Sequence, residues 1–179
     1  MPKLKVGETL LDFVYYTPFS KEISFSKKVA LKEKTAIIFL RYYGCPVCQY
    51  DIHQISVNHK SIVGDSGQIF VVLQSEAEKL AQQIGMDSLP FEIICDPYQT
   101  LYKQFDIMVA NSEEELMTEE EYSQIENELA AYEHGEYEGN ELQLPAVFII
   151  DKNMKVLFTH YGTSLVDIPN VKELEELMK

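Results

Sequence analysis

The chain alternates short apolar runs with amphipathic stretches. The apolar runs are rich in β-branched and aromatic residues and are bounded by turn residues, a pattern typical of buried strands. They cover residues 35–43, 68–74, 91–95 and 146–151. Residues 155–160 follow the last run after a short turn and are expected to pair with it as a hairpin. At the start of the chain, residues 5–25 alternate short apolar runs with turn residues and predict a hairpin-like lead-in.

The amphipathic stretches predict the helices. The first helix is expected to begin at Cys45-Pro46, because proline is tolerated at the first helical position. Its apolar side would carry Ile52, Ile55 and Val57.

Later helices are predicted from their ends. Ser75 with Glu78 is a candidate capping box, Asp96-Pro97 is expected to open a short helix, and Pro169 should open the last one. Strands that alternate with helices, followed by a hairpin and a final helix, indicate an α/β fold. A chain of 179 residues fits a single domain, residues 1–179, with a sizeable core.

The net charge of −14 is confined to one segment. Between Gln104 and Asp151 there are fourteen acidic residues and no Lys or Arg, whereas the rest of the chain holds fifteen of each sign. We interpret residues 111–141, approximately, as an acidic helical insertion, with possible helix starts at Ser112 and Thr118. A solvated helical excursion is the simplest interpretation, and a cover over the active site or a partner surface is the alternative.

Charge and composition indicate which classes of partner and which cellular compartment are compatible with the chain. An acidic surface is a poor match for nucleic acid or an anionic membrane, and no apolar run approaches the roughly 20 residues of a membrane span. The first residues lack the apolar region of a signal peptide. Three cysteines make a disulfide framework improbable. We therefore expect a cytoplasmic protein; the sequence leaves its oligomeric state open.

The candidate chemistry lies in the dithiol motif, Cys45-Pro46-Val47-Cys48, which follows a predicted strand and opens a predicted helix. Amide N–H groups and the helix dipole at such a position stabilise a thiolate and lower its pKa. Cysteines three positions apart face the same end of the helix, so they can close a small disulfide and reopen it by thiol–disulfide exchange. The motif therefore indicates a redox pair.

The alternative is a pair of structural thiols or half of a zinc site. Zinc would need two more ligands, and His53 and His59, six positions apart on one helix, would not converge with the thiols. We expect no metal and no cofactor. Cys95 ends a buried strand and is interpreted as a core thiol, with a resolving or sensing role as the alternative.

Several short motifs outside the acidic segment occur together. They are Val6-Gly7, Asp12-Phe13, the strand leading to Cys45–Cys48, Cys95-Asp96-Pro97, Leu101-Tyr102, the run from Leu144-Pro145 to Ile150-Asp151, Tyr161-Gly162 and Asp167-Ile168-Pro169. With them the chain resembles the thioredoxin-like peroxiredoxins of the alkyl hydroperoxide reductase and thiol-specific antioxidant type. The resemblance implies a thioredoxin-like fold, with a central mixed sheet flanked by helices and a peroxiredoxin-type N-terminal extension.

The chain also departs from that family. A typical peroxiredoxin has Pro-x-x-x-Thr-x-x-Cys, and on this chain the final, peroxidatic cysteine is Cys48. The threonine position is then Cys45 and the proline position is Arg41. The family's second catalytic arginine would stand at Pro145, and Arg41 is the only arginine in the chain. A missing guanidinium weakens peroxide activation, because both peroxide oxygens need placed donors.

The same departures resemble thioredoxin, which has CxxC at this place and a cis-proline before a later strand, a position that Pro145 fits. Which cysteine is the nucleophile therefore stays open; Cys45 at the helix cap is our preference. Arg41 is either an ordinary charge at a strand end or a stabiliser of the thiolate. Pro46 and Pro145 are expected to support the pair.

Two functions follow from these features. The first is a thiol oxidoreductase in which Cys45 and Cys48 reduce peroxides or protein disulfides and are reduced again by an external donor, a thioredoxin-like protein or a small thiol. The second is a non-catalytic redox-sensing or binding module, whose dithiol controls a partner. Turnover with a thiol donor would separate the two functions.

Overall fold

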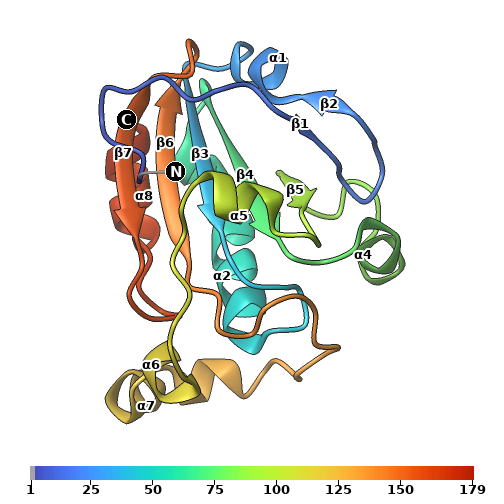
Figure 1. Cartoon of the computed structure of the whole chain (residues 1–179), viewed down its shortest axis with the longest axis vertical. Helices are drawn as coiled ribbons and strands as arrows, with labels where there is room; N and C mark the ends of the chain where they lie inside the picture. Colours follow the sequence, from blue (N-terminus) through green and yellow to red (C-terminus); the bar gives the residue numbers. More distant parts are fainter. Residues whose placement is uncertain (1–2) are drawn as a thin grey trace.

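The computed structural model describes residues 3–179, which fold around a five-stranded mixed sheet (Figure 1). The strands are β3 (Lys34–Phe39), β4 (Gly67–Leu73), β5 (Glu92–Cys95), β6 (Ala146–Asp151) and β7 (Val156–Tyr161). Their order is β5-β4-β3-β6-β7. β3, β4 and β5 run parallel, whereas β6 is antiparallel to both of its neighbours, β3 and β7. This is the mixed sheet of a thioredoxin-like fold.

Helices and a hairpin cover the two faces of the sheet (Figure 1). One face packs against α2 (Pro46–Val57), α3 (His59–Val63) and α8 (Val171–Met178). The other face packs against α1 (Phe25–Val29), α5 (Thr100–Gln104) and the N-terminal hairpin of β1 (Val14–Tyr15) and β2 (Ile23–Ser24). α4 (Ala77–Gln83) connects β4 to β5. None of the helices within residues 3–179 is long and apolar enough to span a bilayer.

The central strand β3 shows why the sheet has two cores. Successive side chains of a strand point to opposite faces. Ala36 and Ile38 therefore belong to the core under α2, and Ile37 and Phe39 to the core under α5. A strand that is buried on both faces reads as a continuous apolar run, which is the pattern that predicted it.

The strand prediction for residues 35–43 is too long by several residues. β3 ends at Phe39, because the chain beyond it turns toward α2. The backbone N–H of Arg41 donates to the sulfur of Cys48 (3.3 Å), and that of Tyr43 donates to the hydroxyl of Ser75 (2.9 Å). The hydroxyl of Ser75 therefore does not cap α4, and the predicted capping box is wrong. The helix begins after Glu76 without a side-chain cap.

The predicted start of the first helix is confirmed, since α2 begins at Pro46 with Cys45 as its N-cap. One part of its predicted apolar side is wrong. Ile52 and Ile55 are buried, whereas Val57 is 62% exposed. The buried side is completed near the helix start by Val47 and Cys48 instead.

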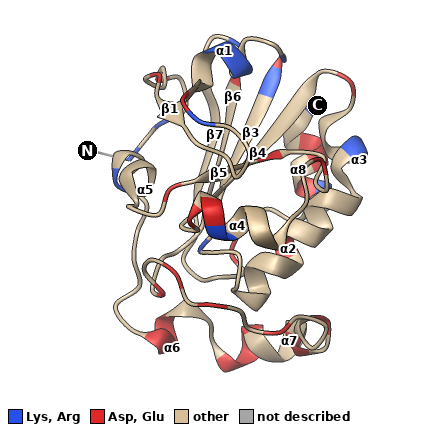
Figure 2. Cartoon of the chain, turned by 90° about the vertical axis from the view of Figure 1, so that its right-hand side faces the viewer, with Lys and Arg blue, Asp and Glu red and all other residues tan. Residues whose placement is uncertain are grey.

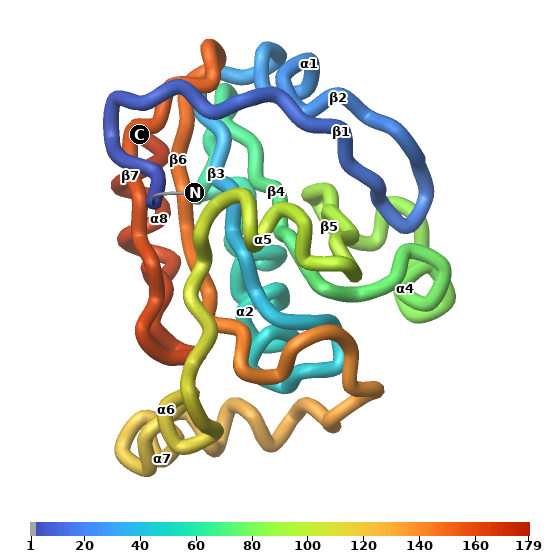
Figure 3. Tube along the Cα trace, in the orientation of Figure 1, coloured from blue at the N-terminus to red at the C-terminus, as the bar shows by residue number. Residues whose placement is uncertain are grey.

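The acidic segment folds as two short helices below α2, α6 (Glu113–Leu116) and α7 (Glu119–Leu129) (Figures 1 and 3). Figure 2 shows acidic residues on both. The predicted start at Thr118 is confirmed, because Thr118 and Glu121 form a capping box. At α6, Ser112 is the N-cap but its side chain makes no cap hydrogen bond.

The two ends of this segment meet on the main body of the fold. The N–H of Ala110 donates to the carbonyl of Leu142 (2.8 Å), and Val109 pairs with Gln143 as an isolated antiparallel bridge. The chain therefore leaves and re-enters the domain at one place, as an insertion would. Leu116 and Leu129 are nevertheless buried in the core under α2.

Candidate active site

The dithiol motif lies at the junction between β3 and α2. Cys45 is the N-cap of α2, with φ −74° and ψ 123°, and Pro46 is the first helical residue. Pro46 lacks an N–H, but the first helical N–H has no partner within a helix, so nothing is lost there. Both cysteines are free thiols; Cys45 is 0% and Cys48 is 3% exposed. They lie 3.2 Å apart, which fits a pair that can close into a disulfide.

Arg41 brings positive charge to this junction. It is buried, and one guanidinium nitrogen, Nη2, donates to Cys45 Sγ at 3.0 Å. The other, Nη1, donates to the carbonyl of Glu141 at 2.5 Å. The guanidinium therefore contacts Cys45, while Cys48 Sγ accepts only the backbone N–H of Arg41. The sequence left two roles open for Arg41, and this geometry fits stabilisation of a thiolate.

The two thiols differ in their ionisation. A hydrogen bond from the Cys48 thiol and the charge of Arg41 lower the pKa of Cys45 to about 5, against the opposing effect of burial. Burial, followed by the neighbouring Cys45, raises the pKa of Cys48 well above its usual range. These opposite shifts favour a thiolate at Cys45 that accepts a hydrogen bond from the Cys48 thiol.

Tyr102 fixes the end of β3 from the opposite face of the sheet. Its single hydroxyl proton is shared between the carbonyls of Leu40 (2.6 Å) and Val72 (2.9 Å). In the sequence Tyr102 is named only as part of the Leu101-Tyr102 motif, so this role was missed. The phenol ties β3 to β4 directly before the chain turns toward the dithiol motif.

Asp51 is a second residue that the sequence analysis missed. It lies one turn after Cys48 on α2, and its Oδ2 is buried without a hydrogen-bond partner. Burial raises the pKa of its carboxyl well above the usual range, and the negative charge of Cys45 adds to the effect. An acidic residue three positions after Cys48 on a predicted helix was the available signal.

Pro145 lies at the same end of the sheet, directly before β6, which pairs with β3. Its carbonyl accepts the N–H of Gly162 (2.9 Å). All peptide bonds within residues 3–179 are trans. The expected cis-proline is therefore wrong: the Pro145 peptide is trans, and its carbonyl is bonded to the residue directly after β7.

Cys95 is placed apart from the dithiol motif. It ends β5, two strands away from β3 in the sheet, and it is buried. Burial raises the pKa of its thiol to about 12, with a smaller effect from Glu138. A thiol of this kind is inert at neutral pH, which fits the core interpretation.

Within residues 3–179, the histidines contact separate partners. His53 lies beside the ring of Tyr132, His59 beside Phe91, and His160 pairs with Asp167 at 2.8 Å. Within residues 3–179, no cluster of three or more His, Cys, Asp or Glu could hold a metal ion.

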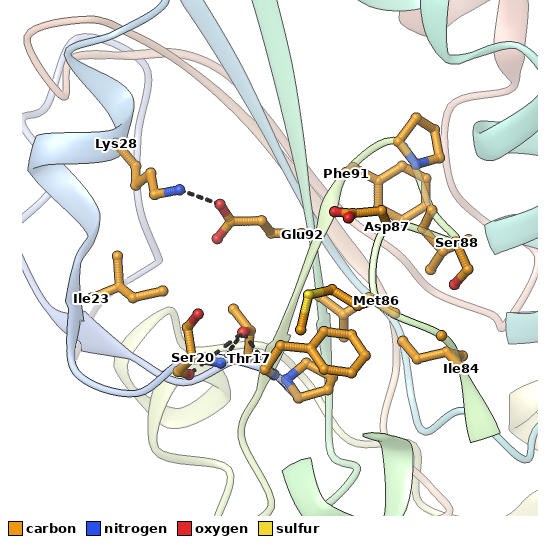
Figure 4. A pocket seen from close by; sticks show the side chains of 16 residues that line it. Thr17, Ser20, Ile23, Lys28, Ile84, Met86, Asp87, Ser88, Phe91 and Glu92 are labelled. Carbon is orange, nitrogen blue, oxygen red and sulfur yellow. Dashed lines mark hydrogen bonds and ion pairs between the residues drawn. The ribbon is translucent and has the colours of Figure 1, made fainter. Parts of the chain in front are cut away.

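A cavity of about 390 Å³ lies away from the dithiol motif, between the N-terminal hairpin and residues 84–91 (Figure 4). Lys28 and Glu92 form an ion pair at its edge, and Glu92 also accepts the hydroxyl of Tyr15 (2.6 Å). Met86 and Phe91 give it an apolar lining. Neither cysteine of the dithiol motif lines this cavity.

Comparison with known proteins agrees with this geometry. The AhpC/TSA family matches residues 6–159. The solved structures that are similar include the peroxidoxin BcpB of Mycobacterium tuberculosis, at 14% identity and a TM-score of 0.67, covering 98% of this chain and 96% of that one. Another is a thiol peroxidase of Chromobacterium violaceum, at 11% identity and a TM-score of 0.63, covering 99% and 87%.

A third similar structure is a yeast mitochondrial 1-Cys peroxiredoxin, at 14% identity and a TM-score of 0.66, covering 98% of this chain and 75% of that one. A comparison with curated proteins gives no significant match. At these identities the structures establish the shared fold, and the family assignment comes from the match over residues 6–159. The chain thus belongs to the AhpC/TSA family and is a thiol-dependent oxidoreductase.

Proposed function

We propose that Cys45 and Cys48 form a redox dithiol that reduces peroxides or protein disulfides, with Cys45 as the attacking thiolate and Cys48 as the resolving thiol. The observation that carries this assignment is the contact between the Arg41 guanidinium and Cys45 Sγ (3.0 Å). Cys48 Sγ receives only the backbone N–H of Arg41. A charge-assisted hydrogen bond favours the thiolate that receives it.

The proposed cycle with a hydroperoxide has two chemical steps. The Cys45 thiolate attacks one peroxide oxygen, an S–O bond forms, the O–O bond breaks, and the other oxygen leaves as an alcohol or water after gaining a proton. The Cys48 thiol then loses its proton and attacks Cys45 sulfur, which forms the disulfide and releases water. With a protein disulfide, Cys45 forms a mixed disulfide and Cys48 displaces the reduced protein.

The cycle closes when an external dithiol, or two small thiols, reduces the Cys45–Cys48 disulfide and is itself oxidised. The similar yeast mitochondrial 1-Cys peroxiredoxin has its thiol resolved via glutathione/thioredoxin systems. We propose a donor of the same chemical class here, in a reducing cytoplasm.

Peroxidase activity is expected to be weak, and the dithiol cycle is expected to be more like that of thioredoxin. The single arginine of the chain contacts Cys45 and the carbonyl of Glu141, and Pro145 stands where the family has its second arginine. Loss of one placed donor typically costs about 10²–10³ in rate. Peroxide activation should be slower than in a peroxiredoxin by a factor of this order.

The test is stopped-flow oxidation by hydrogen peroxide, together with thiol counting and peptide mapping of the oxidised protein. The wild type should oxidise slowly to an intramolecular Cys45–Cys48 disulfide, Cys45→Ser should not react, and Cys48→Ser should stop at a Cys45 sulfenic acid. Cys95→Ser, which removes only the distant thiol, is the matched control and should behave as wild type. A fast peroxide reaction in Cys45→Ser that is absent in Cys48→Ser would instead make Cys48 the peroxidatic cysteine.

A redox-sensing module remains the second candidate, and the complete burial of Cys45 favours it. A sensor would oxidise once and turn over poorly with a thiol donor. Steady-state turnover with dithiothreitol or thioredoxin, with peroxide or insulin as the oxidant, separates a sensor from an enzyme.

A further inference from the structure

Residues 133–141, here called the strap, cross the loop that precedes α2. Figure 3 shows this segment running from the acidic helices toward β6, alongside the turn between β3 and α2. The strap is the last part of the acidic segment, and most of its own residues are exposed.

The strap contacts the residue directly before the dithiol motif through main chain alone. The N–H of Gly135 donates to the carbonyl of Gly44 (2.8 Å), the residue directly before Cys45. A Cβ on Gly44 would lie 2.5 Å from the carbonyl oxygen of Glu136, and a Cβ on Gly135 would lie 2.9 Å from Gly44 Cα. Two glycines are therefore needed for the backbones to come this close.

Side chains from the domain hold the strap on both sides of this contact. Gln49 donates to the carbonyl of Glu133 (3.0 Å), Tyr42 meets His134 (3.2 Å), and Lys79 pairs with Glu136 (2.7 Å). Gln74 then exchanges two hydrogen bonds with Asn140 (2.7 and 3.1 Å). Gln49 and Lys79 lie near the surface, whereas Tyr42 and Gln74 are buried. All of these anchors are polar, so local opening of the strap exchanges their hydrogen bonds for bonds to water.

Arg41 joins the strap to the reactive sulfur. One guanidinium nitrogen contacts Cys45 Sγ and the other contacts the carbonyl of Glu141, at the end of the strap. Cys45 is 0% exposed although it caps a helix at the edge of the sheet. The strap thus lies where a reaction partner of Cys45 would approach.

We propose that the strap selects the reaction partners of Cys45 by size: small hydroperoxides and small thiols reach the sulfur past the strap, whereas a protein disulfide or dithiol reacts only when the strap has moved away from Gly44. This inference rests on the proposed role of Cys45. Thiol–disulfide exchange requires the entering sulfur to approach along the axis of the bond that breaks. A protein partner brings its own main chain close to the sulfur, so it competes with the strap for the same space.

The experiment compares the alkylation of Cys45 by a small reagent, iodoacetamide, and a bulky one, fluorescein maleimide, in the reduced full-length protein. Mass spectrometry identifies the labelled sulfur. In Gly135→Ala the added Cβ meets Gly44 Cα, so the strap must shift. The ratio of the bulky to the small rate at Cys45 should rise about tenfold or more over wild type, which corresponds to about 1.4 kcal/mol.

Gly85→Ala is the matched control, because its Cβ would meet only Ser88 Cβ at 3.9 Å; its ratio should equal that of wild type. If Gly135→Ala fails to fold, the double variant Gln49→Ala/Lys79→Ala, which removes two anchors of the strap, decides the question in the same direction. The proposal is overturned if the ratio stays at the wild-type value in the variant that folds, or if the wild-type ratio already equals the ratio for the same cysteine in the urea-unfolded protein. Alkylation needs no turnover. The alkylation ratio can therefore be interpreted even if the proposed enzyme cycle is not observed.

Discussion

Arg41 contacts both sulfurs of the dithiol motif and the main chain of the strap. Its backbone N–H contacts Cys48 Sγ, and its guanidinium contacts Cys45 Sγ and the carbonyl of Glu141. The sequence could flag this residue as the only arginine, placed four positions before Cys45. It could not show which sulfur the guanidinium reaches, because that depends on how the chain turns after Phe39.

Replacing Arg41 tests the cause of the low pKa of Cys45. Arg41→Gln removes the charge, and Arg41→Lys keeps it but cannot contact the sulfur and the carbonyl as a planar fork does. We expect the pKa of Cys45, about 5 in wild type, to rise by about one to three pKa units in Arg41→Gln, and by less in Arg41→Lys. The pH profile of iodoacetamide alkylation at Cys45 measures this. An unchanged midpoint in Arg41→Gln would attribute the low pKa of Cys45 to the hydrogen bonds from Cys48 and not to the charge of Arg41.

Asp51 makes the stability of the fold depend on pH in a defined direction. Because burial raises its pKa above the ordinary value of 3.8, the folded state binds this proton more tightly than the unfolded state does. Stability is therefore lost as the pH rises through the folded pKa. In Asp51→Asn the side chain at this position carries no charge at any pH. The free energy of unfolding of the variant minus that of wild type should therefore be larger at pH 8 than at pH 5. Urea unfolding at both pH values measures the difference.

Asp65→Asn is the matched control for this change. Asp65 is exposed, and its hydrogen bond with Lys60 lowers the pKa of its carboxyl. The titration of Asp65 affects stability only below pH 4. The difference in the free energy of unfolding between Asp65→Asn and wild type should therefore be constant from pH 5 to pH 8. Equal behaviour of the two variants would contradict the assignment of a protonated Asp51.

Elements with a strong local signal were predictable from the sequence. β6 spans residues 146–151 as expected, because a short, continuous apolar run bounded by turn residues is typical of a strand buried on both faces. α2 begins at Pro46 as expected, since proline and the N-cap position act within a few residues. Thr118 and Glu121 likewise form a capping box through local bonds alone.

Elements decided by distant partners were not predictable. Ser75 has the sequence of a helix cap, but its hydroxyl accepts the N–H of Tyr43, 32 positions earlier. The contact between Gly44 and Gly135 involves main chain only, so it leaves no pattern beyond two glycines among many. The two cysteines and the arginine of the site could therefore be predicted from the sequence, whereas the position of the strap over them could not.

At the scale of the whole molecule, the excess negative charge lies in the acidic segment and not in the main body of the fold. The main body is nearly balanced in charge, and the acidic helices and the strap carry the excess at one end of the molecule (Figure 2). Removal of residues 111–141 would delete twelve glutamates and no basic residue, which changes the formal net charge from −14 to −2. The same removal would uncover Val47 and Tyr50, which lie in or against the core that α7 helps to cover.

We predict that residues 111–141 can be replaced by a short Gly/Ser linker without loss of the fold. Ala110 and Leu142 are already hydrogen-bonded (2.8 Å), so a tight turn can join them. The core loses Leu116 and Leu129, each worth about 2–5 kcal/mol when truncated, but the ordering cost of the helices is lost with them. The variant should melt cooperatively at a lower temperature by circular dichroism. A full-length Glu126→Gln/Glu128→Gln control, which changes charge but not packing, should melt near wild type. A non-cooperative melt of the shortened chain would make α6 and α7 part of the indispensable core.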